Sequence, residues 1–179
     1  MRSRTIAAAQ DSGVTGNSFF NRLVQGSEGR SAMIEIRKPS VSEKPDWLPL
    51  WHGYLTFYET QLPGEITDLT WARLHDDAEP LNILAAYDAD RMIGIVHYQF
   101  HRSTWARNAY CYLEDLFVSQ QVRGAGAGRL LIEAVRRKAQ GAGASRLYWT
   151  TRESNATARA LYDRLATRSD FIQYRMALE

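Results

Sequence analysis

A short glycine-rich loop is the part of the sequence whose spacing most clearly indicates chemistry. Glycine recurs at every second position, at Gly124, Gly126 and Gly128, and Arg123 and Arg129 flank the run. An apolar stretch precedes the loop and a segment with helical periodicity follows it. Helix N-termini expose unpaired N–H groups and a partial positive charge, which suit a phosphate, and glycine lets the backbone approach such a ligand closely. The loop therefore indicates a diphosphate-binding site.

Two familiar phosphate loops differ from this one. A P-loop requires Lys followed by Ser or Thr, whereas here Arg129 is followed by Leu130. The dinucleotide fingerprint is G-x-G-x-x-G in the first strand-to-helix turn, and here G-x-G-x-G follows several strands. A flexible turn without a ligand stays open as an alternative, although three glycines between flanking arginines favour a bound anion.

Two adjacent acids, Glu114 and Asp115, interrupt the apolar run from 109 to 118. Charges inside an apolar strand are a local inconsistency of the kind that functional sites produce. Because successive side chains of a strand point to opposite faces, we expect the two carboxylates on opposite faces, with Glu114 on the face of Leu116 and Val118. A structural ion pair is the alternative interpretation.

A sheet and several helices must position these groups. Apolar patterning predicts strands at 33–38, 82–87, 92–100, 109–118, 146–151 and 171–178, and helices at 47–58, 66–74, 127–139 and 155–166. The turn at 88–90 makes the strands on either side of it an antiparallel hairpin. The expected fold class is α/β, with a mixed, largely antiparallel central sheet flanked by helices.

Composition narrows the class of protein. The chain has 179 residues, of which 45% are apolar, and this predicts one globular domain. A net charge of +2 gives no reason to expect nucleic acid or a membrane surface as a partner, and no apolar run approaches the ~20 residues of a membrane span. The single cysteine, Cys111, is interpreted as a small buried side chain. We expect a cytoplasmic protein that needs no metal.

The N-terminal stretch differs from the rest in composition. Residues 1–32 are rich in Ser, Gly, Ala and Arg and have weak periodicity, whereas an alternating strand begins at Met33. We expect 1–32 to be a disordered extension, or to precede the true start codon, and 33–179 to form the domain.

Two motifs in this order resemble the GNAT superfamily of acyl-CoA N-acyltransferases. Gln121-x-x-Gly124-x-Gly126 is similar to its Q/R-x-x-G-x-G/A signature, and the stretch 155–162 is similar to its N-x-x-A-x-x-L-Y helix. The resemblance covers 33–178 and includes the order of strands and helices. Within the superfamily, 112–118 and the aromatic residues of the 47–58 helix resemble the polyamine and histone acetyltransferase branch.

The resemblance implies how the chain would bind acetyl-CoA, its co-substrate. Backbone groups of Leu116, Phe117 and Val118 would pair with the pantetheine arm, and Asn155 would contact the co-substrate. Tyr162 would protonate the departing thiolate. The pyrophosphate would be held by Arg123, Gly124, Gly126, Ala127, Gly128 and Arg129.

The implied reaction is direct attack of a primary amine on the thioester in a ternary complex. An alkylamine has a pKa of roughly 10.4, so a general base must remove a proton before attack, and Glu114 is the candidate, directly or through water. Asp115 is expected to help bind the substrate, because an acidic site favours a cationic amine, such as a polyamine or a lysine side chain. The resemblance also implies a homodimer. Because 171–178 is expected at the far edge of the sheet, and uncovered edges invite pairing, we expect that strand or its surroundings at the interface. A non-catalytic acyl-CoA sensor and a nucleotide-binding protein of another fold remain as alternatives.

Overall fold

A five-stranded sheet organises the residues that the computed structural model describes, 34–178. Its strands are β1 (Glu35–Arg37), β2 (Leu81–Asp88), β3 (Arg91–His101), β4 (Tyr110–Val118) and β5 (Arg146–Tyr148), and they lie in this order across the sheet. The first four strands are antiparallel to their neighbours, and β5 runs parallel to β4. The mixed, largely antiparallel sheet is thus confirmed, while the expectation for 1–32 concerns positions outside the described residues.

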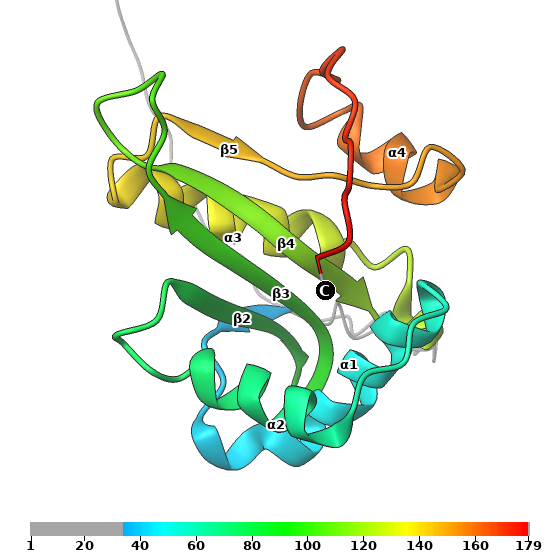
Figure 1. The fold of residues 1–179 in the computed structure, drawn as a ribbon. Helices are drawn as coiled ribbons and strands as arrows, with labels where there is room; N and C mark the ends of the chain where they lie inside the picture. The colour runs from blue at the N-terminus through cyan, green and yellow to red at the C-terminus, as the bar shows by residue number, and fades with distance from the viewer. Residues whose placement is uncertain (1–33, 179) are drawn as a thin grey trace, which may run out of the picture. The chain divides into compact units, whose positions relative to one another are not determined.

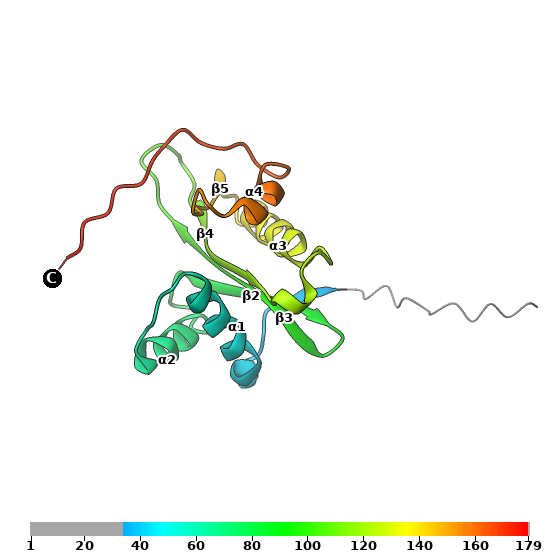
Figure 2. The same ribbon diagram turned by 90° about the vertical axis from the view of Figure 1, so that its right-hand side faces the viewer.

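Helices cover both faces of the sheet. Helices α1 (Lys44–Phe57) and α2 (Gly64–Arg73) lie on one face, and α3 (Ala127–Gly141) lies on the other, as Figures 1 and 2 show. Helix α4 (Ala156–Tyr162) follows β5 and lies on the α3 side. Within 34–178, no helix has the length and apolar character needed to cross a membrane.

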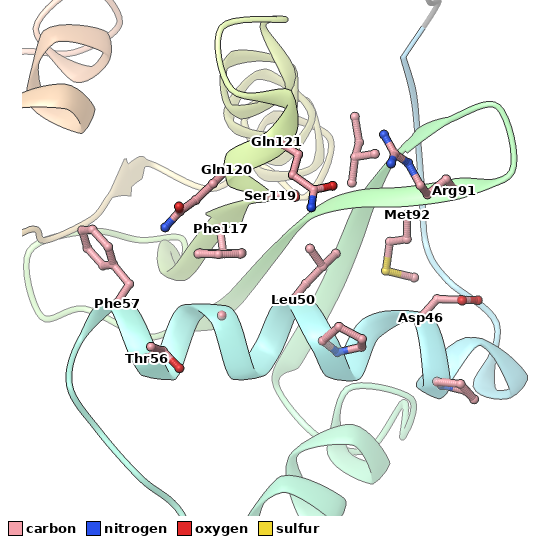
Figure 3. Close-up of a pocket in the computed structure, with 14 residues that line it drawn as sticks. Asp46, Leu50, Thr56, Phe57, Arg91, Met92, Phe117, Ser119, Gln120 and Gln121 are labelled. Carbon is pink, nitrogen blue, oxygen red and sulfur yellow. The ribbon is translucent and has the colours of Figure 1, made fainter.

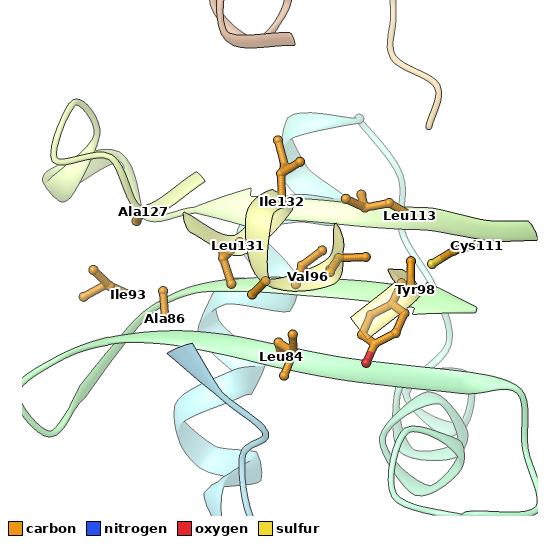
Figure 4. Close-up of a cluster of buried hydrophobic side chains, with 13 residues drawn as sticks. Leu84, Ala86, Ile93, Val96, Tyr98, Cys111, Leu113, Ala127, Leu131 and Ile132 are labelled. Carbon is orange, nitrogen blue, oxygen red and sulfur yellow. The ribbon is translucent and has the colours of Figure 1, made fainter. Parts of the chain in front are cut away.

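Each face has its own apolar core. On the α3 side, Leu131 and Val135 are fully buried against Leu84, Val96 and Leu113 of the sheet (Figure 4). Burying one such aliphatic side chain contributes about 1.5–3 kcal/mol. The α1 side is aromatic instead: Trp47 lies 5.6 Å from Trp51 and 4.9 Å from Trp71, measured between ring centroids. An aromatic layer therefore lies between α1 and the sheet, whose strand β4 carries the paired acids.

The strand predicted at 171–178 is wrong for this structure. The segment forms no ladder with the strands of the described chain (Figure 2), and its large side chains are exposed, from 74% at Ile172 to 88% at Leu178. Alternation decides which side chains of a segment share a face. A strand also needs hydrogen bonds from a neighbouring strand, and among the described residues this segment pairs with none.

Candidate active site

The glycine loop leads directly into α3 and leaves its first turn open. Gly124 and Gly126 have φ values of +91° and +87°, a region that residues with a Cβ occupy only under strain. The Leu130 amide donates to the Gly126 carbonyl over 3.1 Å, so the amides of 127–129 have no partner earlier in the helix. A Cβ added at Gly124 or Gly126 would meet no atom within 4 Å. The loop therefore has the open, amide-lined form that a diphosphate requires.

The two arginines beside the loop differ in how free their charges are. Arg129 Nε lies 2.8 Å from a carboxylate oxygen of Glu133, one turn along α3. Arg123 Nε donates to the Val118 carbonyl over 3.4 Å, and its guanidinium carbon lies 5.9 Å from the centroid of the Phe117 ring. Among the described residues, Arg123 has no carboxylate partner. Arg123 is thus the arginine whose charge is more available to an anion in the loop.

Strands β4 and β5 diverge before β4 ends. Their pairing covers only Tyr110–Tyr112 against Arg146–Tyr148, although β3 accompanies β4 to Val118. The divergence is visible in Figure 1, and the strand predicted at 146–151 ends three residues early for the same reason. Leu116, Phe117 and Val118 lie in the part of β4 that β5 does not accompany. On that side β5 offers their backbone groups no partner, and their pairing with the pantetheine arm stays a prediction.

A β-bulge places the two acids on the same face of the sheet. His97 is opposite Asp115 and Tyr98 is opposite Leu113, so Glu114 is the extra residue. Asp115 contacts His97 and Glu114 contacts Gln99, two residues that share a face of β3. The expectation that the carboxylates lie on opposite faces is therefore wrong, because the extra residue resets the alternation. Leu116 and Val118 pack in the α3 core on the other face.

The surroundings of Glu114 change the pKa of its carboxyl. Burial raises the pKa of the Glu114 carboxyl, and the neighbouring charge of Asp115 raises it further. A hydrogen bond of 2.8 Å from the Gln99 amide opposes these effects. Tyr54 on α1 also lies beside the pair. Burial raises the pKa of its hydroxyl, and the neighbouring charge of Asp115 raises it further. A carboxylate with a raised pKa is better suited to remove a proton near neutral pH.

Buried polar residues of β3 and α1 support the site, and the sequence analysis did not identify them. Asp115 Oδ2 lies 2.9 Å from His97 Nδ1, and His97 Nε2 lies 3.1 Å from Trp47 Nε1. His97 is only 2% exposed. The sequence does contain a pattern that indicates them. His97 and Gln99 are polar residues at alternate positions of an apolar strand, and they interrupt its apolar character as Glu114 interrupts that of β4.

The α4 motif lies near the end of α1. Asn155 caps α4: its side-chain oxygen accepts from the Ala158 amide at 3.4 Å, and its amide donates to Thr151 Oγ1 at 3.1 Å. Tyr162, at the other end of α4, contacts Trp149 edge-on with 5.4 Å between ring centroids. Burial, followed by the nearby Tyr58 hydroxyl, raises the pKa of Tyr162 to about 12. Tyr58, which follows the last residue of α1, lies 4.9 Å from Tyr54, ring to ring. These two tyrosines at the end of α1 therefore neighbour Tyr162 on one side and the acids on the other.

A cavity of about 690 Å³ lies between α1, the start of β3 and the loop after β4 (Figure 3). It is lined by Leu50, Phe57, Met92 and Phe117, and it reaches Gln121 of the glycine motif. Neither Glu114 nor Tyr162 lines it. The cavity therefore borders the diphosphate loop and does not contain the groups expected to react. Within 34–178, no cluster of three His, Cys, Asp or Glu side chains is arranged to hold a metal ion.

Comparison with known proteins identifies the family. The model of the acetyltransferase (GNAT) family matches residues 45–166, which is more than half of the chain. The chain belongs to the GNAT family. It is 32% identical to the D-amino-acid N-acetyltransferase HPA3 of Saccharomyces cerevisiae over 144 residues, which are 79% of this chain and 89% of that protein.

Solved structures agree on the fold. An aminoglycoside acetyltransferase, meta-AAC0020 from an uncultured soil metagenomic sample, superposes with a TM-score of 0.69 at 14% identity, covering 82% of this chain and 97% of the other. The ribosomal-protein-alanine N-acetyltransferase of Brucella melitensis biovar Abortus 2308 gives 0.68 at 19% identity, covering 82% and 99%. The protein is an acetyl-CoA-dependent N-acetyltransferase with the GNAT fold.

Proposed function

We propose that this GNAT enzyme transfers the acetyl group to a cationic primary amine, such as a polyamine or a lysine side chain, and that Glu114 is the base. The observation that carries the proposal is the β4 bulge, which brings the carboxylates of Glu114 and Asp115 to one face, beside the part of β4 that β5 leaves open. Two carboxylates there favour an ammonium group. Asp115, held by His97, would attract the cation, and Glu114 would take its proton.

The chemical step requires three events at the thioester. Glu114 removes a proton from the ammonium, directly or through water, and the free amine forms a bond to the carbonyl carbon. The oxyanion then accepts a hydrogen bond from a backbone amide of β4, for which the stretch 116–118 is the candidate. The attacking nitrogen loses its second proton to water, the C–S bond breaks, and the sulfur leaves with the electron pair and takes a proton or a hydrogen bond.

Tyr162 is proposed as the donor to the leaving sulfur. With a pKa of about 12 it is protonated at neutral pH. A thiol has a pKa of about 8.5, so complete transfer from Tyr162, whose pKa is about 12, to the thiolate is uphill by roughly 3.5 pKa units. Hydrogen bonding to the developing thiolate is therefore the larger part of the proposed role, and water can complete the protonation.

Acids farther from β4 add little to the choice of acceptor. Asp68 pairs with Lys44 over 2.8 Å, Glu79 pairs with Arg73 over 3.5 Å, and the Asp76 side chain accepts from the Ala78 amide over 2.9 Å. Charges that have local partners attract a distant cation less strongly. The preference for a cationic acceptor therefore rests on the pair in the bulge.

A free amino acid is the second candidate acceptor. The relative HPA3 is a D-amino-acid N-acetyltransferase, and an amino acid needs a cation for its carboxylate as well as acids for its amine. Arg152 is exposed at the C-terminal end of α1, where its guanidinium donates to the Tyr58 carbonyl over 2.9 Å and lies 5.2 Å from the Tyr58 ring centroid. Arg152 could pair with a carboxylate at that end of the site.

A panel of acceptors distinguishes the two candidates. Thiol release is measured with acetyl-CoA and spermidine, lysine amide, or D- and L-amino acids at fixed pH. A cationic-amine enzyme has its highest kcat/KM with spermidine or lysine amide, and Arg152→Gln leaves that value unchanged. In an amino-acid enzyme, Arg152→Gln raises KM for amino acids by about tenfold, the effect expected for losing a charge-assisted hydrogen bond. Absence of thiol release with every amine would refute both candidates.

We also propose that two copies associate through the segment 171–178. Ile172, Tyr174, Met176 and Leu178 alternate along this segment, so they share a face when it is extended, and all four are more than 70% exposed. A face of this kind is normally covered in solution, and β5 is the last strand of the described sheet. Light scattering should report twice the chain mass. Tyr174→Asp with Met176→Asp should give the monomer mass, and a monomeric wild-type protein would refute the proposal.

A further inference from the structure

The contacts of His97 determine which of its ring nitrogens carries the proton. An indole N–H can only donate, and Trp47 Nε1 lies 3.1 Å from His97 Nε2. His97 Nε2 must therefore accept, so a neutral imidazole has its proton on Nδ1. Nδ1 lies 2.9 Å from Asp115 Oδ2, and the N–H at that position donates to the carboxylate. Both rings are buried, Trp47 with 0% and His97 with 2% exposure, so water is not available to offer a different arrangement.

We propose that Trp47 and Asp115 together fix the tautomer of His97, and that His97 thereby holds the Asp115 carboxylate oriented beside the base. Trp47 and His97 are then positioning residues for acetyl transfer: neither contacts the substrate, and both act through Asp115. The inference rests on the proposed role of Glu114. Without a fixed donor on Nδ1, the mostly buried Asp115 carboxylate would lie next to a second acid without its hydrogen-bond partner.

The charges around this group of residues are few. Strand β4 contributes Asp115 and Glu114, and α1 contributes the Tyr54 hydroxyl. Helix α2 contributes Trp71, which packs on the far side of Trp47 and carries no charge. The Asp115 charge is one of the causes of the raised pKa of Glu114. A change at His97 is therefore expected to affect the pH at which Glu114 becomes a base.

Two substitutions at His97 separate this role from packing. His97→Leu removes the donor, so the pair of carboxylates should retain a proton to higher pH, and the acidic limb of the kcat/KM profile should move up by about one pH unit. In His97→Asn, the side-chain amide can donate to Asp115 in place of Nδ1, so the limb should stay at the wild-type position. If His97→Leu is folded and active with an unmoved limb, the proposal is wrong.

A spectroscopic measurement tests the tautomer without relying on activity. Long-range ¹⁵N–¹H correlation on the full chain should show the Nδ1–H form for His97, assigned by its disappearance in His97→Asn. In Trp47→Phe the Nδ1–H form should remain, because the Asp115 carboxylate still needs a donor, but the ¹⁵N resonance of Nε2 should move, because it loses the indole donor. An Nε2–H form in the wild-type protein would overturn the proposal even if a variant fails to fold. Absence of any acetyl transfer by the wild-type protein would instead refute the proposed function, while the spectrum still decides the tautomer.

Discussion

The sharpest test of the diphosphate loop is to add one methyl group at Gly126. The Cβ of Gly126→Ala would meet no atom within 4 Å, so the change creates no clash. Its φ of +87° is nevertheless strained for alanine, at a cost of roughly 1–2 kcal/mol. For a chain of this size, that lowers Tm by roughly 2–8 °C. Gly141→Ala is the matched control, because its Cβ also meets nothing within 4 Å and its φ is not positive. Alanine there should be neutral or slightly stabilising.

Binding of acetyl-CoA adds a second quantity to this experiment. At a hundredfold excess over its Kd, the ligand should stabilise the wild-type chain by about 2.7 kcal/mol. The new methyl group would stand in the open space of the loop and strain its backbone, so we expect at least tenfold weaker binding in Gly126→Ala. At the same ligand concentration, the stabilisation then falls to about 1.4 kcal/mol. Melting curves with and without acetyl-CoA measure both effects. A full acetyl-CoA shift in Gly126→Ala would show that the diphosphate is bound elsewhere.

Three further predictions follow from the described contacts. Tyr162→Phe should lower kcat by roughly 10²-fold and leave the acetyl-CoA-induced Tm shift unchanged; turnover within a factor of two of wild type would make Tyr162 a packing residue only. Glu114→Gln should depress kcat/KM most near neutral pH and recover partly as pH rises, because free amine then becomes abundant; an unaltered pH profile would remove Glu114 from the mechanism. Arg37 forms two hydrogen bonds, of 2.9 and 2.8 Å, with Glu43 and lowers the pKa of that carboxyl. This ion pair stabilises the fold above the pKa that Glu43 has in the unfolded chain, and the stabilisation is lost as pH falls through its pKa in the folded chain. In urea unfolding, Glu43→Gln should therefore lower the free energy of unfolding by about 1 kcal/mol at pH 7 and leave it unchanged at strongly acidic pH.

Much of the fold could be predicted because burial repeats with the period of each element. The α3 helix was expected at 127–139 and spans Ala127–Gly141, since Leu131 and Val135 face the sheet one turn apart. The β2–β3 hairpin followed from its turn residues for the same local reason. The failure at 171–178 has a different cause. Strand formation depends on a partner edge, and the pattern of one segment contains no information about where that edge lies.

The candidate site shows the same limit on a smaller scale. Period-two reasoning located Glu114 and Asp115 but placed them on opposite faces, because one extra residue in a bulge changes the alternation without changing the composition. The partner strand contained the missing information: His97 and Gln99 mark one face of β3 as polar, and two acids can both meet that face only if β4 bulges between them. Deleting Glu114 removes the extra residue and the proposed base together. Such a chain would restore regular alternation and keep Asp115 beside His97. It should retain acetyl-CoA binding through 123–129 and lose transfer, whereas unchanged transfer would show that neither Glu114 nor the bulge has a part in catalysis.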